Sequence, residues 1–98
     1  MDFSFDPAKN ARNIDVHGIS FECVNESDWS VALILEDIRR DYGERRYRAL
    51  GSIASRLHVL VFTPRDGCVH VISLRKANKR EIRSYASQTH TEANANGS

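Results

Sequence analysis

The Asp-Gly pair at residues 66–67 constrains the fold of this chain more than any other feature. It separates two runs rich in β-branched residues, Leu57–Thr63 and Val69–Arg75. Asp-Gly between two such runs is typical of a two-residue β-hairpin turn, because both turn positions need a positive φ. The central part of the chain is therefore predicted to be an antiparallel hairpin.

The length of this turn sets the pairing between the two strands. A two-residue turn fixes which residues face each other, whereas a longer turn would shift the register. The opposing pairs expected for the short turn are Phe62–Val71, Leu60–Ser73 and His58–Arg75. His58 and Arg75 would then be neighbours on one face of the sheet.

The first helix is expected between Pro7 and His17. Asp6 can accept hydrogen bonds from the free backbone N–H groups, and proline suits the first helical position. Gly18 suits the left-handed end of the helix. Three residues at helical spacing are expected to face the core, namely Ala8, Ala11 and Ile14.

Local patterns predict the remaining elements. A second helix is expected to begin at Ser20, with Trp29 as a core anchor near its end. A last helix is expected to begin at Asn78, with Glu81 at capping-box spacing. The other expected strands are an edge strand at Phe3–Phe5, a well-covered strand at Val31–Ile38, and a strand of period two at 46–53.

This order of elements predicts an α+β fold, with helices packed on one side of an antiparallel sheet. The 98 residues suffice for a single domain. We expect that domain to cover residues 1–86 and a polar, disordered tail to cover residues 87–98. Cys23 and Cys68 lie far apart and are expected to be buried free thiols.

Positive charge is concentrated in one part of the sequence. Residues 1–38 hold two basic and eight acidic side chains, whereas residues 39–83 hold twelve basic and four acidic ones. A one-sided basic distribution is the usual footprint of a phosphate-binding surface, although small domains also carry uneven solvated charge. No apolar run approaches the roughly 20 residues of a membrane helix, so we expect a cytoplasmic protein without membrane contact.

The densest basic cluster lies between Arg75 and Arg83. One interpretation is a solvated helix face with weak ion pairs. The other is a phosphate clamp, because the planar guanidinium of arginine binds phosphate oxygens in a fork. RNA cleavage would also need a proton carrier, and the candidates are His17, His58, His70 and Tyr85. No Gly-rich phosphate loop and no metal-ligand spacing is present, so neither a cofactor nor a metal is expected.

The order and spacing of several motifs carry a resemblance that covers residues 3–85. The motifs are Phe3-x-Phe5-Asp6-Pro7-x-Lys9-x-x-x-Asn13, His17-Gly18-Ile19-Ser20-Phe21-Glu22, Glu44-Arg45-Arg46, Gly51, Val59-Leu60-Val61-Phe62-Thr63-x-Arg65-x-Gly67, Ile72-Ser73-Leu74-Arg75-Lys76-Ala77, Glu81 and Tyr85. With these motifs the sequence resembles the BrnT family of bacterial type II toxins, the ribonuclease half of BrnT/BrnA toxin–antitoxin modules.

The resemblance implies a RelE-like fold, with two N-terminal helices against an antiparallel sheet and a C-terminal helix. It also implies a metal-independent endoribonuclease that arrests translation and growth. The implied partners are RNA and a BrnA-like antitoxin, with operator DNA bound only through the antitoxin and a possible heterotetramer of the two proteins.

Motif and charge together select the candidate site residues. The expected catalytic residues are Arg75, Arg65, Arg46, His17 and Tyr85. The expected RNA-binding residues are Lys76, Lys79, Arg80 and Arg83. Two other functions remain open: a non-catalytic binding module or corepressor that acts with its antitoxin, and an RNA-binding accessory domain.

Overall fold

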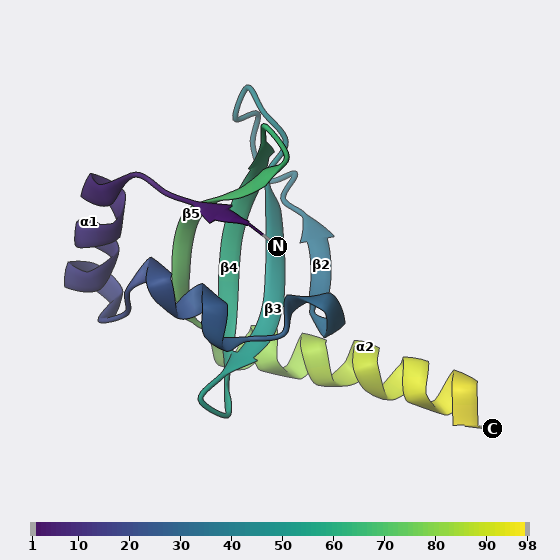
Figure 1. Cartoon of the computed structure of the whole chain (residues 1–98). Helices are drawn as coiled ribbons and strands as arrows, with labels where there is room; N and C mark the ends of the chain where they lie inside the picture. The colour runs from purple at the N-terminus through teal and green to yellow at the C-terminus, as the bar shows by residue number, and fades with distance from the viewer. Residues whose placement is uncertain (1, 98) are drawn as a thin grey trace.

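The chain folds around one five-stranded sheet with the strand order β1-β5-β4-β3-β2 (Figure 1). The structure, a computed structural model, describes the backbone of residues 2–97 and the side chains of residues 2–89. The strands are β1 (Phe3–Ser4), β2 (Leu33–Glu36), β3 (Tyr47–Ile53), β4 (Arg56–Arg65) and β5 (Cys68–Lys76). The helices are α1 (Pro7–His17), α2 (Lys79–Gly97) and the 3₁₀ helices η1 (Phe21–Glu26) and η2 (Trp29–Val31). The predicted α+β class is confirmed.

The sheet is mixed rather than purely antiparallel, which corrects the prediction. Strands β2 to β5 pair antiparallel, but β1 runs parallel to β5, with Phe3 opposite Val69. The connection from β1 to β5 passes through most of the chain, so no tight turn forces the two strands to be antiparallel. The expected edge position of the first strand is confirmed.

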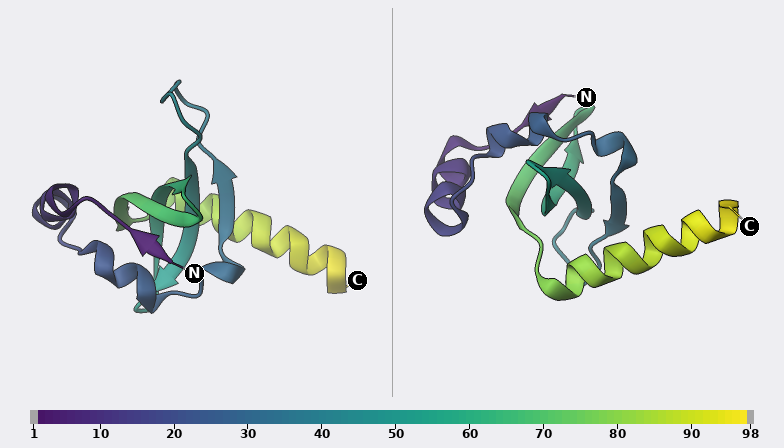
Figure 2. Two further views of the ribbon diagram at one scale, coloured as in Figure 1. Left: turned by 45° about the horizontal axis from the view of Figure 1, so that its top comes forward. Right: turned by 90° about the horizontal axis from the view of Figure 1, so that it is seen from below.

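Different elements cover the two faces of the sheet (Figure 2). The 3₁₀ helices cover one face, where Phe21, Val24 and Trp29 pack with Ala49 and Leu60 in the larger apolar core. The first turns of α2 cover part of the other face, where Tyr85 packs against the smaller cluster of Leu50, Val59 and Ala77. Part of this second face remains uncovered by apolar side chains, and the candidate site lies there.

Trp29 confirms its predicted role as a core anchor. It is 7 % exposed, and its indole Nε1 donates a 2.6 Å hydrogen bond to the carbonyl oxygen of Val24. A Cβ atom placed on Gly51 would lie 2.9 Å from Cζ3 of the indole. The ring therefore needs a residue without a side chain at position 51 of β3.

Helix α1 has the predicted bounds but buries a polar side chain instead of an apolar one. Asp6 caps its first turn by accepting from the N–H of Ala8, and Gly18 ends it at φ 72°. Asn13 is its buried residue, at 6 % exposure. The residues expected to face the core, Ala8, Ala11 and Ile14, are exposed, so that expectation is wrong.

The Asn13 amide explains why a polar face points inward. Its Nδ2 donates to the carbonyl oxygens of Leu74 and Ile19 at 2.8 and 2.9 Å, and its Oδ1 accepts from the N–H of Leu74 at 3.2 Å. Strand β1 pairs with β5 only at Val69 and His70. Beyond those residues, the Asn13 side chain takes the place of a neighbouring strand for the backbone of β5.

Two other expectations need correction. The segment that begins at Ser20 is a pair of 3₁₀ helices rather than an α-helix, with Ser20 as the expected cap. Strand β2 is shorter than the predicted Val31–Ile38 and is an edge strand, with Ile34 49 % exposed. Apolar runs do not by themselves distinguish a covered strand from an edge strand.

The β4–β5 hairpin has the predicted two-residue turn, with positive φ at Asp66 and Gly67. Arg65 pairs with Cys68, and the register keeps the expected Phe62–Val71 pair. A bulge then shifts the register by one residue. The expected pairs Leu60–Ser73 and His58–Arg75 are therefore wrong, and the observed pairs are Leu60–Leu74, Val59–Arg75 and His58–Lys76.

Both cysteines are free, as expected, but the expected burial is wrong, because each is only partly buried. The tail predicted at residues 87–98 lies largely outside the described side chains, which end at residue 89, and residue 98 lies outside the described backbone. The division into residues 1–86 and 87–98 therefore stays a prediction.

The loop between β2 and β3 is held by a buried carboxylate. Asp37 is 4 % exposed and accepts from Nε and Nη2 of Arg39 at 2.8 and 2.9 Å and from the hydroxyl of Tyr42 at 3.1 Å. Its backbone N–H donates to the carbonyl oxygen of Arg46. The hydrogen bonds from Arg39 hold the pKa of Asp37 well below its usual range.

Asn13→Ala is expected to lower the free energy of unfolding by about 2–4 kcal/mol, because three buried backbone groups of Leu74 and Ile19 lose their partner. Urea unfolding followed by circular dichroism measures this loss. Asn25→Ala is the matched control, since Asn25 is exposed and makes one 3.3 Å hydrogen bond to Glu22. Equal losses in the two variants would contradict the role given to Asn13.

Asp37→Asn is expected to cost roughly 1–2 kcal/mol at pH 7, because the buried carboxylate loses charge-assisted hydrogen bonds from Arg39. A depressed pKa stabilises the fold fully above the unfolded value of about 3.9, and this contribution is lost as the pH falls below it. The difference between the parent and the variant should therefore shrink below about pH 4. Urea titrations at pH 7, 4 and 3 measure it, with exposed Asp15→Asn as the control.

Candidate functional site

Three arginines lie on the sheet face that α2 partly covers. Side chains alternate along β3, so Arg46 and Arg48 point away from the core residue Ala49. Arg75 pairs with Val59, and Val59 belongs to the apolar cluster on the same side as Leu50. Arg46, Arg48 and Arg75 therefore share one face, which we call the arginine face.

Glu81 from the first turn of α2 fixes the orientation of Arg75. The two groups form a fork, with Nη1–Oε1 at 2.8 Å and Nη2–Oε2 at 2.9 Å. Asn78 and Glu81 also form the predicted capping box, in which each accepts from the backbone N–H of the other. The fork to Arg75 is the main reason that the pKa of Glu81 lies below its usual range, and the positive charge of Arg48 adds to the shift.

Arg48 also belongs to this face, although no function was predicted for it from the sequence. The Nε atoms of Arg46 and Arg48 are buried and have no hydrogen-bond partner within the described part of the chain. A buried donor without a partner costs about 1–3 kcal/mol, so such groups need a reason. The period-two pattern of residues 46–53 already placed Arg48 beside Arg46, and that signal alone would have found it.

Arg46 connects the arginine face to the tip of the hairpin. Its guanidinium lies 4.2 Å from the centre of the Tyr42 ring and 3.8 Å from a carboxylate oxygen of Glu44. Glu44 also pairs with Arg65 at 3.2 Å. Tyr42 is held in turn by Asp37, so the loop that precedes β3 positions Arg46. Arg46 directly precedes β3 and Arg65 ends β4, so the two side chains meet at one end of the sheet and share the Glu44 carboxylate.

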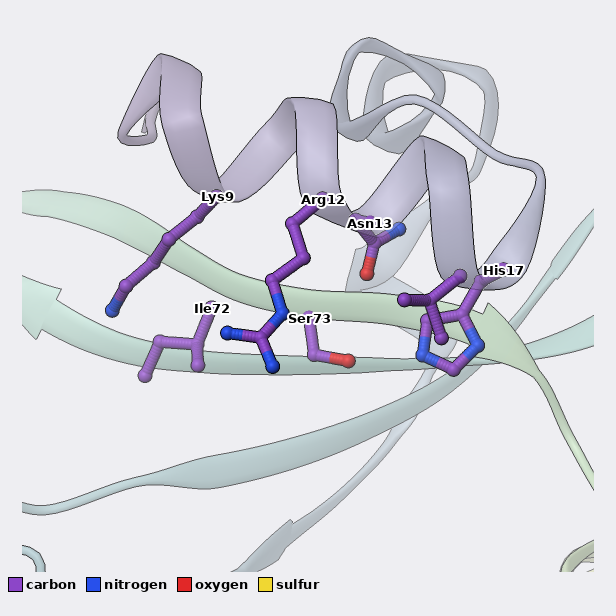
Figure 3. Close-up of a pocket in the computed structure, with 7 residues that line it drawn as sticks. Lys9, Arg12, Asn13, His17, Ile72 and Ser73 are labelled. Carbon is purple, nitrogen blue, oxygen red and sulfur yellow. The ribbon is translucent and has the colours of Figure 1, made fainter.

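His17 lies apart from these arginines, in a cavity between α1 and β5 of about 350 Å³. Lys9, Arg12 and His17 come from α1, and Ser73 comes from β5 (Figure 3). The figure shows Lys9 and Arg12 extending from the helix toward the strand. His17 is the last residue of α1.

Tyr85 lies on the same sheet face as Arg75, under the first turns of α2. Its ring packs on the apolar cluster of Leu50 and Val59 and lines a different cavity, together with Ser27, Asp28 and Gly51. The predicted RNA-binding side chains lie exposed at the end of β5 and along the start of α2, namely Lys76, Lys79, Arg80 and Arg83.

His58 and His70, the other two histidines whose side chains are described, have structural partners. His58 is buried, and its Nδ1 lies 2.7 Å from the carbonyl oxygen of Arg56. Nδ1 of His70 lies 3.0 Å from the hydroxyl oxygen of Ser4, a contact that joins β5 to β1. Burial lowers the pKa of His70, and the positive charges of Arg65 and Lys9 add to this effect.

Two features are absent from the described residues. No group of three or more His, Cys, Asp or Glu side chains in that part of the chain is placed to hold a metal ion. None of the described helices combines the length and the apolar character that crossing a membrane requires.

Comparison with known proteins identifies the family of the chain. No curated protein matches the chain. The family model described as the ribonuclease toxin, BrnT, of type II toxin–antitoxin systems matches residues 5–81, which include α1, the whole β2–β5 sheet and the capping box of α2. This chain therefore belongs to the BrnT family of ribonuclease toxins.

Proposed function

We propose that this protein is a metal-independent endoribonuclease whose arginine face binds the scissile phosphate of RNA. The observation that carries the proposal is the grouping of Arg46, Arg48 and Arg75 on one face, with two buried Nε donors that lack a partner in the described chain. Guanidinium groups fixed in a partly buried site stabilise the negative charge that develops on a phosphate during cleavage. They supply the positive charge that other nucleases take from a metal ion.

The proposed reaction transfers the phosphate within the RNA strand. The ribose 2′-oxygen loses a proton and attacks phosphorus, and the bond from phosphorus to the 5′-oxygen breaks as that oxygen takes up a proton. The products are a 2′,3′-cyclic phosphate and a 5′-hydroxyl. Arg75 and Arg48 would stabilise the pentacoordinate intermediate, while Glu81 holds the Arg75 fork rather than accepting a proton, because its pKa is lowered.

His17 and Tyr85 are the expected catalytic residues that can carry a proton, and we assign this role to His17. Its cavity contains Ser73, which lies two residues before Arg75 on the same strand. Tyr85 packs instead into the apolar cluster under α2. Arg65 is assigned a phosphate contact beside Arg46, and the exposed bases of Lys76, Lys79, Arg80 and Arg83 are assigned to the RNA backbone.

We infer that the protein arrests translation in the cytoplasm, adopts the RelE-like variant of the α+β fold, and is neutralised by a BrnA-like antitoxin. The two proteins would form a heterotetramer that contacts operator DNA through the antitoxin. Family membership supports the existence of an antitoxin partner.

A non-catalytic binding module is the second candidate. The Arg75–Glu81 fork favours it, because the carboxylate occupies donors on both terminal nitrogens that a reacting phosphate would otherwise use. Such a protein would bind RNA, or act with its antitoxin as a corepressor, without cleaving.

Arg48→Gln is expected to lower the rate of RNA cleavage about 100–1000-fold, because one donor to the pentacoordinate phosphate is lost. Arg75→Lys should lower it by a similar factor, since lysine keeps the charge but loses the fork geometry. Single-turnover cleavage of single-stranded RNA in EDTA, with identification of cyclic-phosphate ends, measures both effects.

The matched control for these substitutions is Arg56→Gln, which removes an exposed arginine from the opposite end of β4. Thermal unfolding of each variant checks that the fold is retained. Parent-like cleavage by Arg48→Gln would refute the assigned role, and intact RNA retained by the parent protein would select the binding module.

A further inference from the structure

The cavity between α1 and β5 holds an unusual combination of charges. Lys9 and Arg12 are three residues apart on α1, so both side chains lie on the side of the helix that faces the strand (Figure 3). His17 completes the basic wall at the end of the helix. No carboxylate lines the cavity, although Asp6 and Asp15 lie on or beside the same helix.

The two cations of this cavity are free to bind a ligand. The side chains of Lys9 and Arg12 form neither an ion pair nor a hydrogen bond with another residue that the structure describes. By contrast, Arg39, Arg65 and Arg75 are each paired with a carboxylate. A concave site with two unpaired cations and polar neighbours has the chemistry that recognises an anion.

Hydrogen bonds hold the backbone of α1 against β5 beside the cavity. Asn13 joins α1 to β5 through its hydrogen bonds to Leu74, directly beside the cavity-lining Ser73. The wall on the strand side is formed by Ile72 and Ser73, where the bulge interrupts the ladder. The backbone positions that carry Lys9 and Arg12 are therefore fixed relative to the strand, and binding has only to order the two side chains.

Ser73 connects the cavity to the arginine face. It pairs with Val61, and Val61 packs on the apolar cluster that contains Leu50 and Val59. Ser73 therefore lies on the same face of the sheet as Arg75, two residues along the strand. An extended polyanion that lies on Arg75 reaches the cavity without crossing the sheet.

We propose that the α1–β5 cavity is a phosphate subsite that binds a backbone phosphate next to the scissile one, with Arg12 and Lys9 as its charged ligands. This inference rests on the proposed RNA substrate and deepens it, because it predicts the path of the strand from the arginine face to α1. An acidic segment of a protein partner is the competing occupant, and single-stranded RNA is favoured because Ser73 of the cavity lies on the same sheet face as Arg75.

The test measures binding of a short single-stranded RNA with 2′-O-methyl groups, which the enzyme cannot cleave. A series of oligonucleotides carries one neutral methylphosphonate at each successive position. Fluorescence anisotropy gives the affinity of the parent, Arg12→Gln, Lys9→Gln and the control Arg56→Gln, at several salt concentrations. Arg12 and Arg56 are both exposed, so each substitution removes one charge without disturbing the core.

For the parent and Arg56→Gln, neutralising one particular phosphate should weaken binding about 3–10-fold. For Arg12→Gln, neutralising that phosphate should have no further effect, because the charge that met it is already absent. The salt dependence of Arg12→Gln should also be lower than that of the parent by about 0.7 in the slope of log K against log salt concentration.

The outcomes separate this inference from the proposed function. If Arg12→Gln and Arg56→Gln show the same phosphate profile, the subsite is refuted while the arginine face stands. If Arg12→Gln weakens capture of the cognate antitoxin and leaves RNA affinity unchanged, the acidic protein segment is the occupant and the subsite is again refuted. If the parent binds no RNA at all, the proposed function itself fails.

Discussion

The hydrogen bonds of the Asn13 amide are the interaction on which the arrangement of this protein depends. Strand β1 protects only the first part of the outer edge of β5, and the amide satisfies the backbone of Leu74 beyond it. Because the same side chain also binds the carbonyl oxygen of Ile19, it ties together α1, the start of the 3₁₀ segment and the sheet. Helix α1 can then hold its basic side chains against β5 although the helix buries almost no apolar surface.

The sequence was informative wherever local chemistry decides the structure. Asp66-Gly67 specified the turn, Asp6-Pro7 and Gly18 specified the ends of α1, and the alternation of residues 46–53 specified the two faces of β3. The sequence was misleading where a residue distant in the chain determines the local structure. Ala8, Ala11 and Ile14 form an apolar stripe, yet α1 turns Asn13 inward, because the edge of β5 needs hydrogen bonds more than it needs apolar cover.

The same distinction applies to the site. Basic residues close together in the sequence, such as Lys79 and Arg80, were predicted to bind RNA, and they lie exposed on α2. The arginine face is assembled from β3 and β5, which pair on opposite sides of β4, and only the tertiary structure places Arg48 near Glu81. Two buried guanidinium nitrogens have no hydrogen-bond partner among the described residues, and this costs stability that a small core supplies with difficulty, as is typical of functional positions.

The bulge in the β4–β5 hairpin has a consequence for which residues of β5 are functional. With uninterrupted pairing, Arg75 would face His58, whose cross-strand partner Gly51 lies against the Trp29 ring on the core side. The single additional residue exchanges the two sheet faces for every later side chain of β5. The Arg75 guanidinium, which would otherwise point into the hydrophobic core, therefore lies beside Val59. The number of residues between Val71 and Arg75 thus determines the chemistry of this surface as much as the identity of Arg75 itself.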